Sequence, residues 1–328
     1  MTWRHATGAV ASQIRRMLAI ATTTSIELQG QPAVLLVTLS GFVATALIPL
    51  LQLHSFGEPG RLARDGGLAY QMVIGIVLAA IGAATTLHDE IDSGAVSSAI
   101  SKPVSRDVFL LGKWLGVMRV VLRFWFCALS AILVAERIAE RMTPDGPATD
   151  KPAQLALLLA PALALICAGY RHNRKGRRFC KGALDALAAL SAALLALAFV
   201  FDRTGAASPS LANLDLRIVP VSVLVLMSLA VNAAIALALA TRLGAAPSIA
   251  ICLALLFLGL ASDAIRLLPF GFLSVILPDV QSFWMCDSLA DGASLPVGYL
   301  GAAAIYSISL VAVALGVGML SLRRREIA

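Results

Sequence analysis

Long apolar runs separated by short polar stretches make up most of this chain. A helix that crosses a bilayer needs about 20 mostly apolar residues, and eight stretches of the sequence come close to that length. The predicted spans are Ala33–Gln52, Ala69–Leu87, Trp114–Ala135, Gln154–Tyr170, Ala183–Phe201, Ile218–Ala240, Pro247–Leu268 and Tyr299–Leu322. The pattern therefore predicts an all-α fold, a single polytopic membrane helix bundle over residues 1–328.

Two segments outside the spans are also apolar in part. Ala11–Gly30 mixes Arg15, Arg16 and Glu27 with apolar positions, a pattern typical of a helix that lies in the membrane interface. The stretch between the last two spans, residues 269–298, is too short and too interrupted by proline to cross twice, yet too apolar for a solvated loop. Irregular backbone at that depth needs protein or water to satisfy it. We expect short helices there that dip into the outer leaflet or cap the bundle.

Composition supports a membrane protein and charge gives its orientation. Hydrophobic residues make up 59% of the chain and charged residues 14%, against about 25% charged in soluble domains, and the mean hydropathy is +0.85. No short N-terminal apolar run ends in a cleavage-site pattern, so we expect no removable signal peptide. With eight spans and a cytoplasmic N-terminus, 16 basic residues fall inside and 8 outside, and the basic loop Arg171–Lys181 and the tail Arg323–Arg325 both fall inside. This bias predicts that both termini are cytoplasmic.

The third span is predicted to be longer than the bilayer is thick. No proline interrupts Asp107–Ala135, so a continuous helix would be about 43 Å long at a rise of about 1.5 Å per residue. The excess over the hydrocarbon core of about 30 Å should project into the cytoplasm, with Lys113 at the water edge. Arg119 and Arg123, four residues apart, either extend to the lipid headgroups or pair with an acid of a partner or cavity.

Catalytic and nucleotide-binding patterns are not found in the sequence. No predicted span contains histidine, and the cysteine spacing has no metal-binding pattern. Asp263, an acid well inside a predicted span, is a functional candidate or forms an ion pair with Arg266 one turn away. A phosphate loop ends in Gly-Lys-Ser/Thr, whereas Gly112-Lys113 is followed by Trp114 and has no glycine five residues before it. We therefore expect a chain that is not an enzyme, binds no metal and does not hydrolyse ATP.

The basic loop Arg171–Lys181 reads RHNRKGRRFCK. Its charge could attract nucleic acid, but it holds one aromatic residue and is tethered between two spans. Anionic lipid headgroups attract basic residues near the surface at about 1 kcal/mol each. Lipid contact and topology therefore explain the loop, and we expect no nucleic-acid partner.

One polar segment, residues 88–113, differs from an ordinary connection between spans. It reads HDEIDSGAVSSAISKPVSRDVFLLGK. Residues Glu90–Ser101 have the spacing of a short amphipathic helix, and Ser105 or Asp107 can cap the helix that follows. A short helix joined to a long one would act as a lever, because pressure on it would move the third span.

At these residues the chain resembles the membrane subunit of an ABC-2 type transporter. Such permeases have an acidic stretch, a glycine before a short helix, a Lys/Thr-Pro-Val-Ser-Arg turn and a Gly-Lys pair in this order. Three more stretches are similar to the family: Thr22–Val37 to its elbow helix (here residues 11–30) entering the first span; Ile276–Gly292 to its outer loop; and Ser321–Ala328 to its basic end. The family core has six spans, so the helix pair within residues 154–201 would be an insertion.

The resemblance implies a permease in the cell (inner) membrane that moves a substrate using ATP hydrolysed by a separate cytosolic ATPase subunit. ATP and Mg²⁺ would sit on that partner, no cofactor on this chain, and a second permease chain would complete the transporter. It also implies that residues 90–101 form a coupling helix. The residues implied to contact or shape the docking site are Glu90, Gly94, Lys102, Pro103, Ser105 and Arg106. No substrate-binding residue can be assigned by the resemblance.

Two other classes of membrane protein fit the sequence less well. A stand-alone ion-coupled secondary transporter would need broken spans and ionisable groups near the midplane, where this sequence has Ala, Leu and Val. A membrane enzyme would need an intramembrane histidine or a carboxylate pair. The sequence favours the ABC-2 type permease over both.

Overall fold

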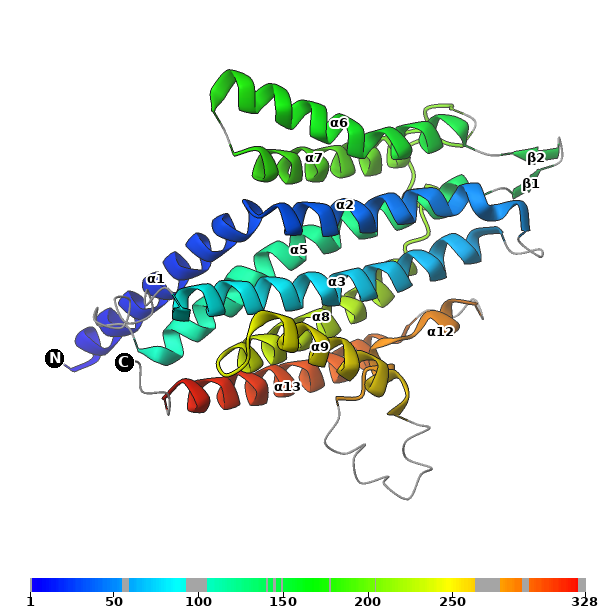
Figure 1. The fold of residues 1–328 in the computed structure, drawn as a ribbon. Helices are drawn as coiled ribbons and strands as arrows, with labels where there is room; N and C mark the ends of the chain where they lie inside the picture. The colour runs from blue at the N-terminus through cyan, green and yellow to red at the C-terminus, as the bar shows by residue number, and fades with distance from the viewer. Residues whose placement is uncertain are drawn as a thin grey trace.

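A computed structural model describes residues 2–54, 59–92, 105–139, 141–143, 146–148, 150–176, 178–203, 205–262, 278–290 and 295–323. These residues are almost entirely helical, which confirms a polytopic helical bundle. They also include one small antiparallel hairpin, in which β1 (Arg141–Thr143) pairs with β2 (Gly146–Ala148). The helices lie roughly side by side along one direction, with α1 oblique to them (Figure 1).

Seven helical stretches in the described residues are long and apolar enough to cross a membrane. The long helices are α2 (Pro32–Leu47, extended by the 3-10 helix η1, Ile48–His54), α3 (Pro59–Asp92), α5 (Arg106–Ile138), α6 (Lys151–Lys175), α7 (Phe179–Val200), α8 (Ile218–Ala240) and α13 (Val297–Arg323). The predicted span Pro247–Leu268 is represented by α9 (Ala245–Leu260). Its 16 residues extend about 24 Å, less than the bilayer core, and residues 263–277, which include Asp263 and Arg266, lie outside the described part. The eighth span is therefore not confirmed.

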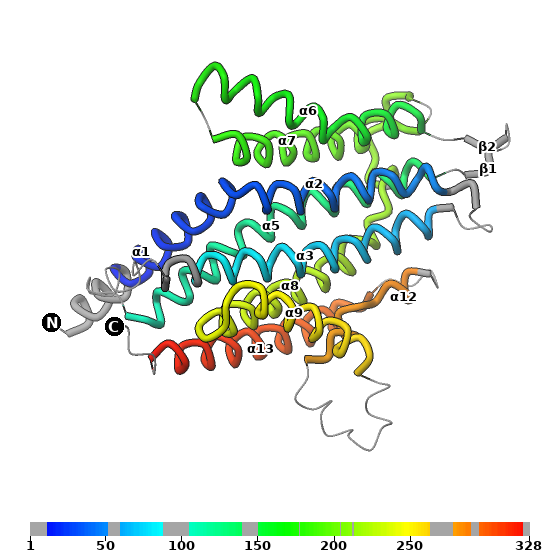
Figure 2. The backbone as a smooth tube through the Cα atoms, in the orientation of Figure 1, coloured from blue at the N-terminus to red at the C-terminus, as the bar shows by residue number. Residues whose placement is uncertain are grey.

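From α2 onward, successive long helices run in opposite directions (Figure 2). The start of α5, the turn between α6 and α7, and the ends of α8 and α13 gather at one end of the bundle, here called the basic end (Figure 1). The hairpin, the start of α6, the end of α7 and the short helix α12 (Cys286–Ala290) lie at the other, here called the hairpin end (Figure 1). The described parts of the polar segment (88–92 and 105–113), the turn between α6 and α7 and the end of α13 thus lie at one end of the bundle, and the cytoplasmic location of that end stays a prediction.

Helices α3, α5 and α8 pack together at the centre of the bundle. A hydrogen-bonded chain joins all three: the Gln71 side chain donates to the Trp125 carbonyl (3.2 Å), Ser222 Oγ donates to Gln71 Oε1 (2.9 Å), and Trp125 Nε1 donates to the Ser222 carbonyl (2.8 Å). Gln71 and Ser222 are buried, and paired polar groups in such a site fix the helices relative to one another.

Helices α6 and α7 form a layer of their own beside α2 and α5 (Figure 1). They pack against each other as an antiparallel pair, and Gly176, at a φ of 59°, ends α6 in the left-handed conformation that glycine adopts without strain. These are the two helices that the sequence predicted at Gln154–Tyr170 and Ala183–Phe201. Helix α6 is longer than predicted at both ends, and α7 is longer at its N-terminal end.

The interfacial helix predicted at Ala11–Gly30 is the second part of α1 (Thr2–Gln29). This helix ends at Gly30–Gln31, and α2 begins with Pro32 in its first turn, where proline is tolerated. Arg15 and Arg16 are exposed, while one face of α1 packs closely on the first half of α5. The location of α1 in the membrane interface stays a prediction.

The segment before α13 caps the bundle where it is described. Asp279 accepts hydrogen bonds from Ser262 Oγ and from the Ser282 backbone N–H (both 3.3 Å), at the start of the 3-10 helix η3 (Gln281–Phe283). Phe283 is buried and stacks on Tyr306 of α13. Short helices that cover the bundle were predicted here, and the described part of residues 269–298 has them.

Candidate functional site

The predicted coupling site lies at the basic end, between α3 and α5. Of its six residues, Gly94, Lys102 and Pro103 lie outside the described residues, and Glu90 is described in its backbone only. α3 continues through Asp92, so Glu90 belongs to the last turn of this long helix. The prediction of a separate coupling helix over Glu90–Ser101 is therefore wrong for its first three residues, which continue α3. The rest of that range lies outside the described residues.

Ser105 is the N-cap of α5. Its backbone is extended, with φ −67° and ψ 144°, and its Oγ accepts a hydrogen bond from the Val108 N–H (3.4 Å). This satisfies one of the free N–H groups that begin every helix. Of the two caps that the sequence allowed, Ser105 is the one used, while Asp107 lies in the first turn and forms an ion pair with Arg323 of α13.

Arg106 fastens the start of α5 to the end of α13. Its Nη1 donates to the carbonyls of Leu322 (2.9 Å) and Arg323 (3.0 Å). Arg242, in the turn after α8, donates to the carbonyl (3.2 Å) and Oγ (2.8 Å) of Ser321. The last carbonyls of a helix lack partners within it and carry partial negative charge. Arg106 and Arg242 therefore bind three successive carbonyls of α13.

Lys113 is not at the water edge, contrary to the sequence prediction. It is 2% exposed, with Nζ 3.5 Å from the Thr86 carbonyl of α3 and 5.7 Å from the centre of the Phe109 ring. The prediction failed because it considered α5 alone, whereas α3 packs against α5 and brings the Thr86 carbonyl to Lys113. Lys113 of α5 thus contacts α3 directly.

Gly112 and Gly116 bring α1 against α5. A Cβ on Gly112 would lie 2.9 Å from Ile20 Cβ and 3.0 Å from the Met17 carbonyl oxygen. One on Gly116 would lie 2.6 Å from Thr24 Cβ. Small residues four apart on a helix allow such close backbone approach in membranes. The sequence singled out Gly112 for its place beside Lys113 and gave no reason for it.

Arg119 and Arg123 were left with two interpretations, and protein contacts are found for both. Arg119 donates to Thr22 Oγ1 of α1 (2.9 Å). Arg123 donates to Gln29 Oε1 of α1 (3.0 Å) and forms an ion pair with Asp185 of α7 (2.5 Å). Pairing with an acid is therefore confirmed for Arg123.

A second ion pair, between Arg137 and Asp150, was missed by the sequence reading. Arg137, near the end of α5, lies 2.8 Å from Asp150 and also donates to the Ala198 carbonyl of α7. The two side chains are 3% and 7% exposed. Asp150 is the N-cap of α6 and accepts from the Ala153 N–H (3.1 Å). That N-cap pattern, Asp-Lys-Pro before an apolar run, was the available signal.

The described residues hold no group of three His, Cys, Asp or Glu that could bind a metal ion. In the segment outside the spans, burial, together with the nearby carboxylates of Asp65 and Asp287, raises the pKa of the Cys286 thiol to about 12. This thiol is therefore protonated at neutral pH and is a poor nucleophile. The polar side chains of the described site form hydrogen bonds and ion pairs that hold neighbouring helices to the two ends of α5.

No family model, curated protein or solved structure matches the chain.

Proposed function

We propose that this chain is the permease subunit of an ABC-2 type transporter, which moves a substrate across the cell membrane with ATP hydrolysed by a separate subunit. The observation that carries the proposal is the course of α5. The polar segment leads into Ser105, and α5 then runs without a break for 33 residues, about 50 Å. A helix of this length transmits a displacement at its start to the far end of the bundle.

The contacts of α5 support a rigid transmission of this kind. Near its start it is fastened to α13 by Arg106, to α3 by Lys113 and to α1 by Arg119. At its far end Arg137 binds α6 and α7. A push on the polar segment would therefore move several helices together, as rigid-body switching requires.

The partners follow from the same proposal. A cytosolic ATPase subunit would dock on the polar segment and bind ATP and Mg²⁺, and a second permease chain would complete the substrate path. Both termini would be cytoplasmic. A stand-alone ion-coupled carrier is the alternative, and it would need no ATPase.

Charge reversal within the polar segment tests the docking role. We expect Glu90→Lys and Lys102→Glu each to reduce co-purification of the ATPase subunit about tenfold or more, because losing one charge-assisted contact and adding repulsion costs at least about 1.4 kcal/mol. The measurement is the ratio of ATPase to permease after affinity purification from the native membrane, with the adjacent reading frames as the source of candidate ATPases.

Arg106 needs a matched control because it also binds α13. Arg106→Glu and Arg242→Glu each remove an arginine that donates hydrogen bonds to the end of α13. Only Arg106 lies in the polar segment. The docking role requires ATPase loss with Arg106→Glu and its retention with Arg242→Glu. If the three variants of the polar segment fold and retain as much ATPase subunit as Arg242→Glu, the proposal is refuted. Movement of substrate by the purified chain alone, down an ion gradient, would also refute it.

The orientation has its own test in a cysteine-free background. Asn173→Cys lies in the exposed turn at the basic end, and Ser208→Cys lies in the exposed loop at the hairpin end. We expect a membrane-impermeant maleimide to label Ser208→Cys on intact cells and Asn173→Cys only after permeabilisation. The reverse pattern would place the basic end outside and contradict the orientation.

A further inference from the structure

A cavity of about 390 Å³ lies at the hairpin end between α5, α6, α7 and the loop that follows α7. Small-molecule sites have volumes of about 300–1,000 Å³, so this cavity is large enough for a ligand. It lies apart from the coupling site, at the opposite end of α5. What it could bind follows from the chemistry of its two halves.

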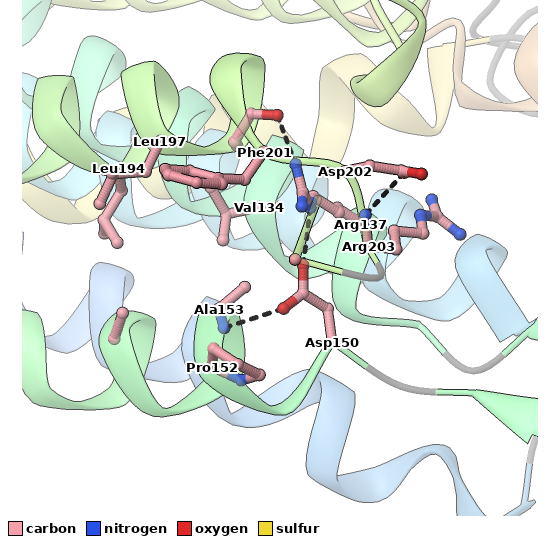
Figure 3. A pocket seen from close by; sticks show the side chains of 13 residues that line it. Val134, Arg137, Asp150, Pro152, Ala153, Leu194, Leu197, Phe201, Asp202 and Arg203 are labelled. Carbon is pink, nitrogen blue, oxygen red and sulfur yellow. Dashed lines mark hydrogen bonds and ion pairs between the residues drawn. The ribbon is translucent and has the colours of Figure 1, made fainter. Parts of the chain in front are cut away.

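One half of the cavity is apolar. Side chains from three helices line it: Val134 of α5, Ala153 and Ala156 of α6, and Leu194 and Leu197 of α7. Figure 3 shows Leu194, Leu197 and Phe201 together at one side of the cavity, away from Arg203 and Asp202. From Leu194 to Phe201 the helix rises about 10 Å, so the apolar half has room for part of one acyl chain.

The other half carries charge of both signs. Arg137, Asp150, Asp202 and Arg203 line it, two cations and two anions. Arg137 and Asp150 are paired and buried, whereas Asp202 and Arg203 are neighbours in the loop, and Asp202 Oδ1 accepts from the Arg203 backbone N–H (2.6 Å). The mouth is therefore polar but electrically balanced, and offers no net attraction to an anion.

Arg137 holds the cavity open. It reaches from α5 to Asp150 at the start of α6 and to the Ala198 carbonyl near the end of α7 (Figure 3). These contacts fix the outer ends of α6 and α7 on either side of the guanidinium. The cavity beside Arg137 is thus bounded by an ion pair whose two charges already neutralise each other. Its walls are held in place without a bound ligand.

The wall of the cavity reaches the surface of the bundle. Leu197 is 52% and Phe201 40% exposed, and both line the cavity. An exposed apolar surface on a membrane-spanning helix contacts acyl chains. A chain can therefore enter from the bilayer, with its headgroup near the loop at the level of Asp202 and Arg203.

We propose that this cavity binds one phospholipid with a zwitterionic phosphoethanolamine headgroup. Its acyl chain would occupy the apolar half, its phosphate would accept hydrogen bonds from the arginine side of the mouth, and its ammonium would donate to Asp202. Charge-assisted hydrogen bonds of both kinds match a mouth that holds one half-buried loop cation, Arg203, beside one anion, Asp202. The proposal requires only that α6 and α7 span a bilayer, and it does not depend on the transport function.

Native mass spectrometry of the purified, full-length protein tests it, after exchange into detergent with added phosphatidylethanolamine or phosphatidylglycerol. These lipids share the phosphate, but phosphatidylglycerol lacks the ammonium. We expect one phosphatidylethanolamine to be retained per chain at least about tenfold better than phosphatidylglycerol, as one charge-assisted hydrogen bond predicts. Asp202→Asn should bring the two lipids to equal retention.

A cavity-filling variant distinguishes this site from lipid bound around the bundle. Ala156→Leu fills the apolar half, while Ala162→Leu adds the same volume to an exposed position of α6. We expect retention to fall about tenfold in the first variant only. Equal retention of both lipids by the unmodified protein, or full retention by folded Ala156→Leu, would overturn the proposal. If Ala156→Leu does not fold, the lipid comparison and Asp202→Asn decide.

Discussion

Replacing Arg137 by Met should lower the free energy of unfolding by about 3–5 kcal/mol, because it leaves the buried Asp150 carboxylate without its partner. The pair is 3% and 7% exposed, so water cannot take over the role of the guanidinium. The same change also removes the hydrogen bond to the Ala198 carbonyl. The measurement is reversible unfolding in mixed micelles by titration with a denaturing detergent.

The pair between Arg123 and Asp185 is the matched control. It joins the same helix α5 to the same layer, but its side chains are 30% and 39% exposed. Solvent-exposed pairs contribute about 0–1 kcal/mol, so Arg123→Met should cost far less than Arg137→Met. The double variant Arg137→Met with Asp150→Asn should recover much of the loss, because Asn keeps the N-cap acceptor and removes the charge. Equal costs at Arg123 and Arg137, or no recovery in the double variant, would show that burial of this pair is not decisive.

These two ion pairs mark the limit of what the sequence could predict about the layer of α6 and α7. Apolar runs of span length are a local signal, so both helices were predicted, with each end within about five residues of its observed place. The partners of Arg123 and Arg137 are 62 and 13 positions away in the chain, and no local pattern pairs them. Arg123 and Arg137 are 14 residues apart, which places them about 21 Å apart along α5 and within about 40° of each other around its axis. Both therefore lie on the face of α5 that contacts the layer of α6 and α7.

The errors at the basic end have one physical cause. Each span was treated as a separate helix with water at its ends, which placed Lys113 in contact with solvent and ended the second span at Leu87. In the folded chain α3 continues to Asp92, and Lys113 is buried with Nζ near the Thr86 carbonyl of the same helix. The N-cap at Ser105 was predictable, since the cap is a local property of the backbone. The partner of Arg106 was not, because the end of α13 is more than 200 residues away.

The contact of α1 with α5 gives the second large effect, at Gly116. In Gly116→Ala the new Cβ would lie 2.6 Å from Thr24 Cβ and 2.9 Å from the Ala21 carbonyl oxygen. Backbone atoms cannot turn aside, so α1 must move away from α5. Overpacking of this kind costs about 1–3 kcal/mol, which outweighs the gain of up to about 1 kcal/mol from replacing glycine by alanine in a helix.

Gly316→Ala separates packing from helix propensity, because a Cβ on Gly316 of α13 would meet no atom within 4 Å. We expect this control to leave stability unchanged or to raise it, and Gly116→Ala to lower it. Hydrogen exchange followed by mass spectrometry should locate the change: backbone amides of α1 should exchange about tenfold faster for each 1.4 kcal/mol lost. Unchanged protection of α1 in Gly116→Ala would contradict a rigid contact. Because Thr22 and Gln29 of α1 also accept hydrogen bonds from Arg119 and Arg123, a displaced α1 would break both contacts with α5.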